Sequence, residues 1–174
     1  THVIKVNEAD LEKQNKIGEI IFNNIFGSPT EQQMHLMLSG SGELFASPML
    51  LNFMSKITLD KFPNVTFSIY TNGLLSESRW HRIKHLETAI EKVVVSIDAT
   101  CAKTYEKIRR GGEWNLLLKN MEFLKNKKQS SNMKLHTRMI VQNGNYSEIP
   151  KFYELSTQFD TDIIEYSRLT NWGT

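Results

Sequence analysis

The feature that most constrains the fold is a repeated alternation of short apolar segments with longer amphipathic ones. The short segments are rich in β-branched residues and recur roughly every 30 residues, a spacing typical of strand–helix–strand units. Five strands are expected, over residues 33–39, 65–71, 92–98, 134–142 and 162–169. Strands that alternate with helices in this way pair in parallel through right-handed crossovers. The sequence therefore predicts one α/β domain over residues 1–174, either an open doubly wound sheet or a segment of a barrel.

Helices are expected between these strands, and several of them begin at recognisable capping residues. Ser47 followed by Pro48 predicts a helix start, since serine caps helix N-termini and proline suits the first turn. Asn145 with Glu148 three residues later is a variant of the capping box. The long helices are expected over residues 7–26, 47–61, 76–86, 115–127 and 145–159. The three consecutive valines at 93–95 predict a strand that is covered on both faces.

Composition and charge exclude several classes of protein. Hydrophobic residues make up 40% of the chain and charged residues 23%, which is typical of folded globular proteins and not of disordered ones. The formal net charge of +2 gives no field strong enough to predict nucleic acid as a partner. No apolar run approaches the roughly 18 residues of a membrane-spanning helix, so no membrane partner is expected.

The cysteine and histidine content bears on metal sites and on the redox compartment. Cys101 is the only cysteine, so an internal disulfide is impossible and a reducing, cytoplasmic setting is expected. His81 and His85 share a helix face, but no third ligand accompanies them. The sequence therefore predicts no metal site formed by these 174 residues.

Polar residues follow the predicted strands at their carboxyl ends, which is where parallel sheets bind ligands. Glu43 follows the first strand after a glycine-rich turn, and Ser96 ends the third strand. Arg109 lies in the loop after a short helix. An acid, a hydroxyl and a guanidinium at one edge would suit a ligand with a free α-amino acid end, because the acid binds the ammonium and the other two bind the carboxylate. S-adenosylmethionine (SAM) has such an end.

The order and content of these segments resemble the radical SAM superfamily, in particular its SPASM/twitch branch of iron–sulfur oxidoreductases. The matching segments are HLMLSGSGE at 35–43 with Ser47-Pro48, IYTNGLL at 69–75, VVVSIDA at 93–99, YEKIRRGG at 105–112, VQNGNY at 141–146 and YSRLTNWG at 166–173. The resemblance spans nearly the whole chain. It implies a partial parallel (β/α) barrel, in which this chain resembles the second to sixth strands and the first strand is missing.

The resemblance also implies which residues bind the amino-acid end of SAM. Ser41, Gly42 and Glu43 stand where the family has its Gly-Gly-Glu motif, which implies contact with the amino group of SAM. Ser41 replaces the usual first glycine and leaves the acid in place. Ser96 and Arg109 stand where members of the branch contact the SAM carboxylate.

Further positions follow from the same resemblance. Asp98 would lie beside the ribose of SAM, and Thr71 and Asn72 would line the cavity. Val141 and Gln142 match the stretch near the adenine. No catalytic residue is identified, and the substrate, a small molecule or a peptide, stays unknown.

The main departure from the family concerns its [4Fe–4S] cluster. Members hold the cluster with a Cys-x3-Cys-x2-Cys motif, which this sequence lacks, and such clusters need thiolates. We therefore expect the chain to be the central part of a longer enzyme, with weak SAM affinity, no cluster and no activity of its own. The parent enzyme would cleave SAM reductively to start radical chemistry on its substrate.

Two alternatives stay open at this point. The chain could be a naturally degenerate paralogue, or a non-catalytic α/β barrel that acts as a binding module. A lyase or aldolase that uses a lysine Schiff base is disfavoured, because no lysine ends a strand in an apolar setting. Without a first strand, the edge of the 33–39 strand would also be unpaired, and open edges recruit partners. Self-association through that edge, or its cover by the N-terminal segment, is expected.

Overall fold

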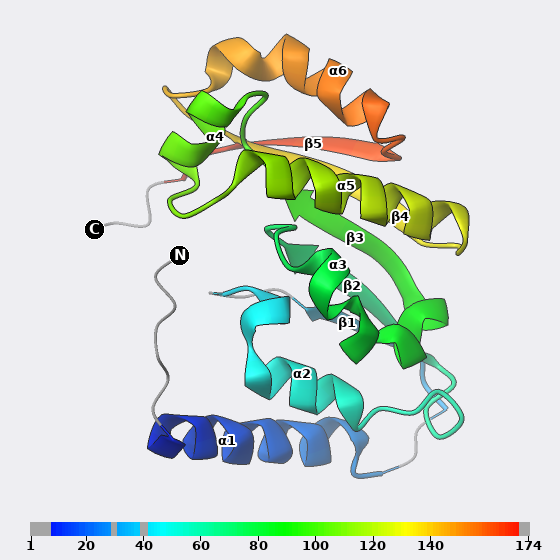
Figure 1. Cartoon of the computed structure of the whole chain (residues 1–174). Helices are drawn as coiled ribbons and strands as arrows, with labels where there is room; N and C mark the ends of the chain where they lie inside the picture. Colours follow the sequence, from blue (N-terminus) through cyan, green and yellow to red (C-terminus); the bar gives the residue numbers. More distant parts are fainter. Residues whose placement is uncertain (1–7, 29–30, 39–41, 171–174) are drawn as a thin grey trace.

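A computed structural model describes residues 8–28, 31–38 and 42–170 and contains one five-stranded sheet (Figure 1). The strands are β1 (Met34–Leu38), β2 (Val65–Thr71), β3 (Ile90–Ser96), β4 (Lys134–Val141) and β5 (Ile163–Arg168). All neighbouring strands pair in parallel, and their order in space, β1-β2-β3-β4-β5, repeats their order along the chain. The predicted α/β class, the parallel pairing and the five strands are confirmed.

Six α-helices and four short 3₁₀ helices connect and cover the strands in the described part of the chain. The α-helices are α1 (Glu8–Phe26), α2 (Pro48–Ser55), α3 (Ser76–Arg79), α4 (Ala102–Ile108), α5 (Trp114–Gln129) and α6 (Ile149–Gln158). The 3₁₀ helices are η1 (Leu44–Ala46), η2 (Trp80–Arg82), η3 (Lys84–Ala89) and η4 (Tyr146–Glu148). Ser47 caps α2 as predicted, because its hydroxyl accepts the Leu50 N–H.

Two predicted helices are shorter than expected. The prediction over 47–61 was wrong at its end, because α2 stops at Ser55 and the chain turns so that Ile57 and Phe62 are both buried. The prediction over 76–86 was wrong in type after its first turn, since η2 and η3 replace the α-helix. Trp80, Ile83, Leu86 and Ala89 are all buried, and their spacing of three matches the three residues per turn of a 3₁₀ helix.

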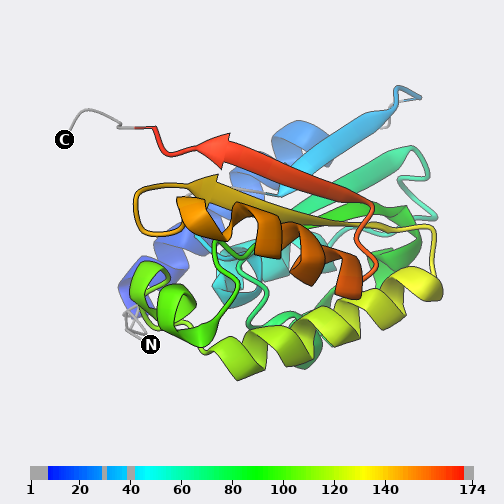
Figure 2. The same ribbon diagram turned by 90° about the horizontal axis from the view of Figure 1, so that it is seen from above.

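The helices α2 to α6 lie on one side of the sheet, and α1 packs against α2 (Figures 1 and 2). We call the side that these helices cover the covered face. Its apolar side chains include Phe67 of β2, Val95 of β3 and Leu135 of β4, all fully buried in the core. The other side, the open face, carries the alternate residues of each strand and is covered by no helix of the described ranges.

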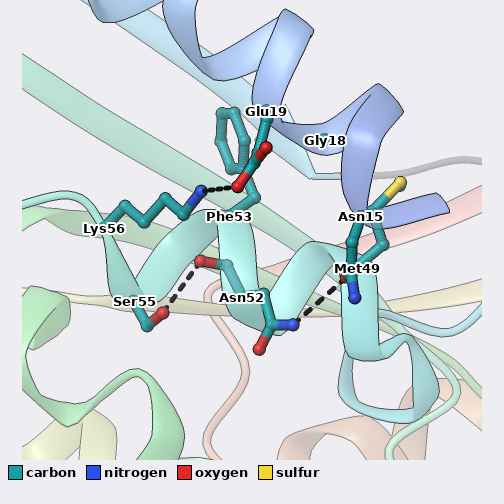
Figure 3. A pocket seen from close by; sticks show the side chains of 8 residues that line it. All are labelled: Asn15, Gly18, Glu19, Met49, Asn52, Phe53, Ser55 and Lys56. Atoms are coloured by element: carbon teal, nitrogen blue, oxygen red, sulfur yellow. Dashed lines mark hydrogen bonds and ion pairs between the residues drawn. The ribbon is translucent and has the colours of Figure 1, made fainter. Parts of the chain in front are cut away.

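The contact between α1 and α2 is partly aromatic and partly polar. The ring of Phe22 packs against Phe26 and Phe53 with centroid separations of 5.1 and 5.7 Å. Gly18 allows close approach, since a Cβ there would lie 3.1 Å from Met49 Cγ. Figure 3 shows the groove of about 330 Å³ beside this contact. Its polar groups mostly bond to one another, as in the Lys56–Glu19 ion pair of 3.2 Å. These bonds join α1 to α2.

In the described residues, each outer strand of the sheet has one neighbour, because β1 pairs only with β2 and β5 only with β4. The expected unpaired edge on β1 is therefore present in this part of the chain, while self-association through it stays a prediction. Among the described helices, none combines the length and the apolar character needed to cross a membrane.

Candidate functional site

Glu43 joins the end of β1 to the end of β2. Its Oε1 accepts the hydroxyl of Thr71 at 2.6 Å, and its Oε2 accepts the N–H of Asn72 at 2.6 Å. A further, longer bond from the Phe45 N–H, at 3.3 Å, makes Glu43 the N-cap of η1. The predicted residues Glu43, Thr71 and Asn72 are thus brought together. A carboxylate can accept about four hydrogen bonds, so Glu43 keeps capacity for one further donor.

Asp98 and Arg109 form an ion pair at the end of β3, where the Nη2–Oδ2 distance is 2.6 Å. The Asp98 side chain is only 6% exposed, and its Oδ1 also accepts the N–H of Ile140 at 2.6 Å. Asp98 has a φ of +66°, a left-handed conformation that aspartate tolerates better than most residues. Arg109 Nε is buried and has no hydrogen-bond partner among the described residues. Arg109 is therefore held in place while its buried Nε donor stays unpaired among the described residues.

Ser96 differs from these residues because its side chain has no hydrogen bond in the described part of the chain. It is half-buried at the end of β3, two residues before Asp98, and its Cα partner on β4 is Arg138. Its hydroxyl is therefore available to a ligand at the same edge of the sheet. The structure gives no direct contact between Ser96 and either Glu43 or Arg109.

The end of β4 is tied to the end of β3 through Asn145. The Nδ2 of this fully buried residue donates to the carbonyl oxygens of Asp98 and Ile140 at 2.8 and 2.9 Å. Its Oδ1 accepts the N–H of Gln142 at 2.8 Å, while Val141 packs against the core. The predicted capping box was therefore wrong, because the Asn145 side chain caps no helix. Nothing in the sequence alone signals this role.

Glu148, the other member of that predicted box, binds the start of α4 instead. It accepts the N–H and hydroxyl of Thr100 at 2.6 and 2.8 Å, and also the hydroxyl of Thr104. Burial raises the pKa of Glu148, but the hydrogen bonds from the two threonines outweigh it and the pKa is lowered overall. Cys101, which lies between them, is exposed.

A pocket of about 810 Å³ lies between the loop after β2 and the loop that joins α4 to α5. It is lined by residues of both loops and of α4: Asn72, Leu74, Tyr105, Ile108, Arg109, Arg110, Gly111 and Gly112. Two predicted site residues, Asn72 and Arg109, thus face one cavity. The Tyr105 hydroxyl is buried without a partner among the described residues, and burial raises its pKa to about 12. Sequence reasoning missed this tyrosine, which is protonated at neutral pH and can donate a hydrogen bond.

The remaining predicted positions are in the glycine-rich turn. Ser41 lies outside the described residues. No described atom comes within 4 Å of the place that a Cβ would take at Gly42, so the backbone there is open to approach by a ligand. In the described residues no group of three or more histidine, cysteine or acidic side chains is arranged to hold a metal ion.

Comparisons with known proteins do not identify the chain. No protein-family model matches it, and no curated protein matches it either.

Proposed function

We propose that this chain is the SAM-binding section of a radical SAM enzyme and that its parallel sheet is a partial barrel of that type. The proposal is supported chiefly by one observation: Ser96, whose hydroxyl has no hydrogen bond among the described residues, lies at the carboxyl ends of the strands, as do the Arg109 guanidinium and the Glu43 carboxylate. By itself the chain is proposed to bind SAM weakly and to be inactive.

The chemistry of these groups fits the amino-acid end of SAM. Arg109 has five N–H donors, of which Asp98 takes one, and its buried Nε lacks a partner in the described residues. Leaving such a donor unpaired costs about 1–3 kcal/mol, and a bound carboxylate would remove part of this cost. Ser96 can donate to the same carboxylate, and Glu43 can accept from the ammonium.

The chain's own residues would position SAM and do no chemistry themselves. Asp98 is a positioning residue, because it holds the guanidinium of Arg109 while Asn145 and Ile140 fix Asp98 in turn. Gly42 leaves room for close approach of the ligand to the backbone. When bound, SAM would supply the radical that starts the reaction.

The residues present do not fit a [4Fe–4S] cluster. A cluster of this kind needs several thiolates, and Cys101 is the only cysteine of the sequence. Its exposed thiol lies 3.6 Å from the hydroxyl of Thr104. In this proposal the cluster ligands come from residues outside the sequence given, and no step of the reaction is assigned to the chain.

Titration of the chain with SAM, followed by saturation-transfer NMR at millimolar ligand, tests the proposal. Ser96→Ala should weaken binding about tenfold, because it removes a hydrogen bond to a charged group. Ser55→Ala is the matched control, since its hydroxyl bonds only to the Asn52 carbonyl in the described residues, on α2. Adenosine, which lacks the amino-acid end, should bind equally to all three proteins.

Absence of SAM binding to the wild-type chain, or equal binding to the wild type and Ser96→Ala, would contradict the proposal. Either result would favour the alternative, a non-catalytic α/β protein that acts as a binding module. The fold of each variant is checked by circular dichroism before titration.

A further inference from the structure

The open face carries a row of basic side chains along β4. Lys134, His136 and Arg138 occupy positions i, i+2 and i+4 of this strand, so their side chains point to the same side of the sheet. At about 3.3 Å per residue the row is roughly 13 Å long. Lys92 of β3 is the Cα partner of Lys134 and extends the row sideways. We call these four residues the basic row.

Two lysines of the basic row lie opposite each other with no acid to separate them. Neither Lys92 nor Lys134 has an ion-pair partner among the described residues. Like charges directly opposite in a sheet are destabilising. Asp162, the nearby acid at the start of β5, already pairs with Lys128 at 3.3 Å and accepts the Leu135 N–H. Among the described residues, Asp162 therefore forms no ion pair with Lys92 or Lys134, although its charge acts on His136.

The other half of the basic row contains buried polar atoms without partners. Arg138 Nη2 pairs with Glu165 Oε1 at 2.9 Å, and Ser167 donates to the same oxygen. Arg138 Nε and His136 Nε2 are buried and have no hydrogen-bond partner among the described residues. The pKa of His136 is lowered, first by burial and then by Lys92, while Asp162 and Glu165 act in the opposite direction.

We propose that the basic row is a binding site for a small dianion, whose two charged groups are carboxylates or phosphates. Two features argue for an anion and against a plain solvated surface: the opposed lysines, whose repulsion an anion would relieve, and the incompletely satisfied guanidinium. Arg138 is the Cα partner of Ser96, a proposed SAM-binding residue, so the two sites adjoin at this end of the basic row, whereas Lys92 and Lys134 lie at its other end. Lys92→Met therefore tests the inference separately from SAM binding, which Ser96→Ala tests.

Titration with pyrophosphate and with glutarate, followed by ¹⁵N–¹H NMR at low salt, tests this inference. Saturable shifts are expected for the amides of β3 and β4 and should weaken as salt is added. Lys92→Met should reduce affinity about threefold, the size expected for a partly exposed charge pair. Arg138→Met should reduce it about tenfold, because a guanidinium bonds an oxyanion more strongly.

Lys103→Met is the matched control, because Lys103 is an exposed lysine on α4 and its loss changes net charge equally. It should leave affinity unchanged. Lys92→Met keeps the test decisive if Arg138→Met fails to fold, since no described ion pair depends on Lys92. Binding of both probes would indicate a general dianion site, and binding of one alone would identify phosphate or carboxylate. No saturable shift with either probe, or an equal loss in Lys103→Met, would overturn the inference.

Discussion

The two faces of the sheet differ in what they contribute. On the covered face, consecutive strands present large apolar side chains such as Phe67, Val95 and Leu135, all fully buried. On the open face the same strands present His35, Ser96 and other polar or charged groups. The His35 ring lies 2.8 Å from the Thr66 hydroxyl and 2.7 Å from that of Ser68. The same strands thus place apolar side chains in the core on one face and polar side chains on the other.

This difference shows how a single parallel sheet can keep its stability separate from its candidate sites. Side-chain burial dominates the free energy of folding, and the covered face provides most of it. Residues of the open face are therefore free to be incompletely paired, as Ser96 and Arg138 are in the described part of the chain. Paired substitutions on the two faces test this division.

The largest effect is expected for neighbouring residues on opposite faces of β2. Phe67→Ala should lower the free energy of unfolding by about 3–5 kcal/mol, because it leaves a cavity in the core. Thr66→Ala, on the open face, should lower it by less than about 1 kcal/mol. Urea unfolding followed by circular dichroism measures both. Similar losses in the two variants would show that the open face is also packed.

The Asp98–Arg109 pair at the strand ends and the Glu165–Arg138 pair on the open face should differ in how much they stabilise the fold. Asp98→Asn should lower the free energy of unfolding by about 2 kcal/mol, since it leaves the Arg109 guanidinium beside a neutral, buried group. Glu165→Gln should cost less than about 1 kcal/mol, because Glu165 and Arg138 are 38% and 31% exposed and water screens them. Urea unfolding measures the loss of unfolding free energy in both variants. A larger loss for Glu165→Gln would reverse the assigned ranking.

The stability of the fold should depend on pH through His136. The pKa of His136 is lowered, first by burial and then by Lys92; Lys134 acts in the same direction, and Asp162 and Glu165 oppose it. The folded protein therefore favours the neutral ring. Stability is complete above the ordinary histidine pKa of about 6.5 and falls as the pH drops through and below that value.

Replacement of this histidine checks the assignment. His136→Gln should flatten the loss of unfolding free energy between about pH 6.5 and pH 5, because the titrating group is gone. His81→Gln is the control, since His81 is exposed on η2, and it should retain the wild-type profile. An unchanged profile in His136→Gln would contradict the prediction.

The smallest effect is expected at Lys92. Lys92→Met should change the free energy of unfolding by no more than about 0.5 kcal/mol, in the stabilising direction, because it removes repulsion from Lys134. The gain should shrink in high salt. Thermal unfolding at two salt concentrations measures this difference. A clear destabilisation would mean that Lys92 has a structural partner.

Most of the fold could be predicted from the sequence, because strand residues such as Val65, Phe67 and Ile69 carry a strong local pattern. The covered and open faces could not be separated in β3. Its three valines at 93–95 read as one apolar run, and only the register shows that Val94 faces away from the core cluster. The 3₁₀ segment was missed although its buried residues are spaced by three, because the prediction applied the α-helical period.

The candidate site was predictable in its location but not in its internal contacts. Residues at the ends of parallel strands must share one edge, so Glu43, Thr71 and Asn72 could be grouped in advance. The pairing of Asp98 with Arg109 and the bridging role of Asn145 depend on loop conformations. No periodic pattern encodes those loops. The burial of the Tyr105 hydroxyl could not be predicted either, because the burial of a single atom is set by packing.

The strand order has a consequence for how such a chain can assemble. Each strand pairs only with the strands that precede and follow it in the described chain. Every strand pairing therefore joins segments that are separated by a single helical connection. The entropic cost of closing a loop rises with the length of the loop, and no pairing in the described sheet spans more than one such connection. The sheet can therefore form by stepwise addition, and its edges can accept another strand without altering the registers already made.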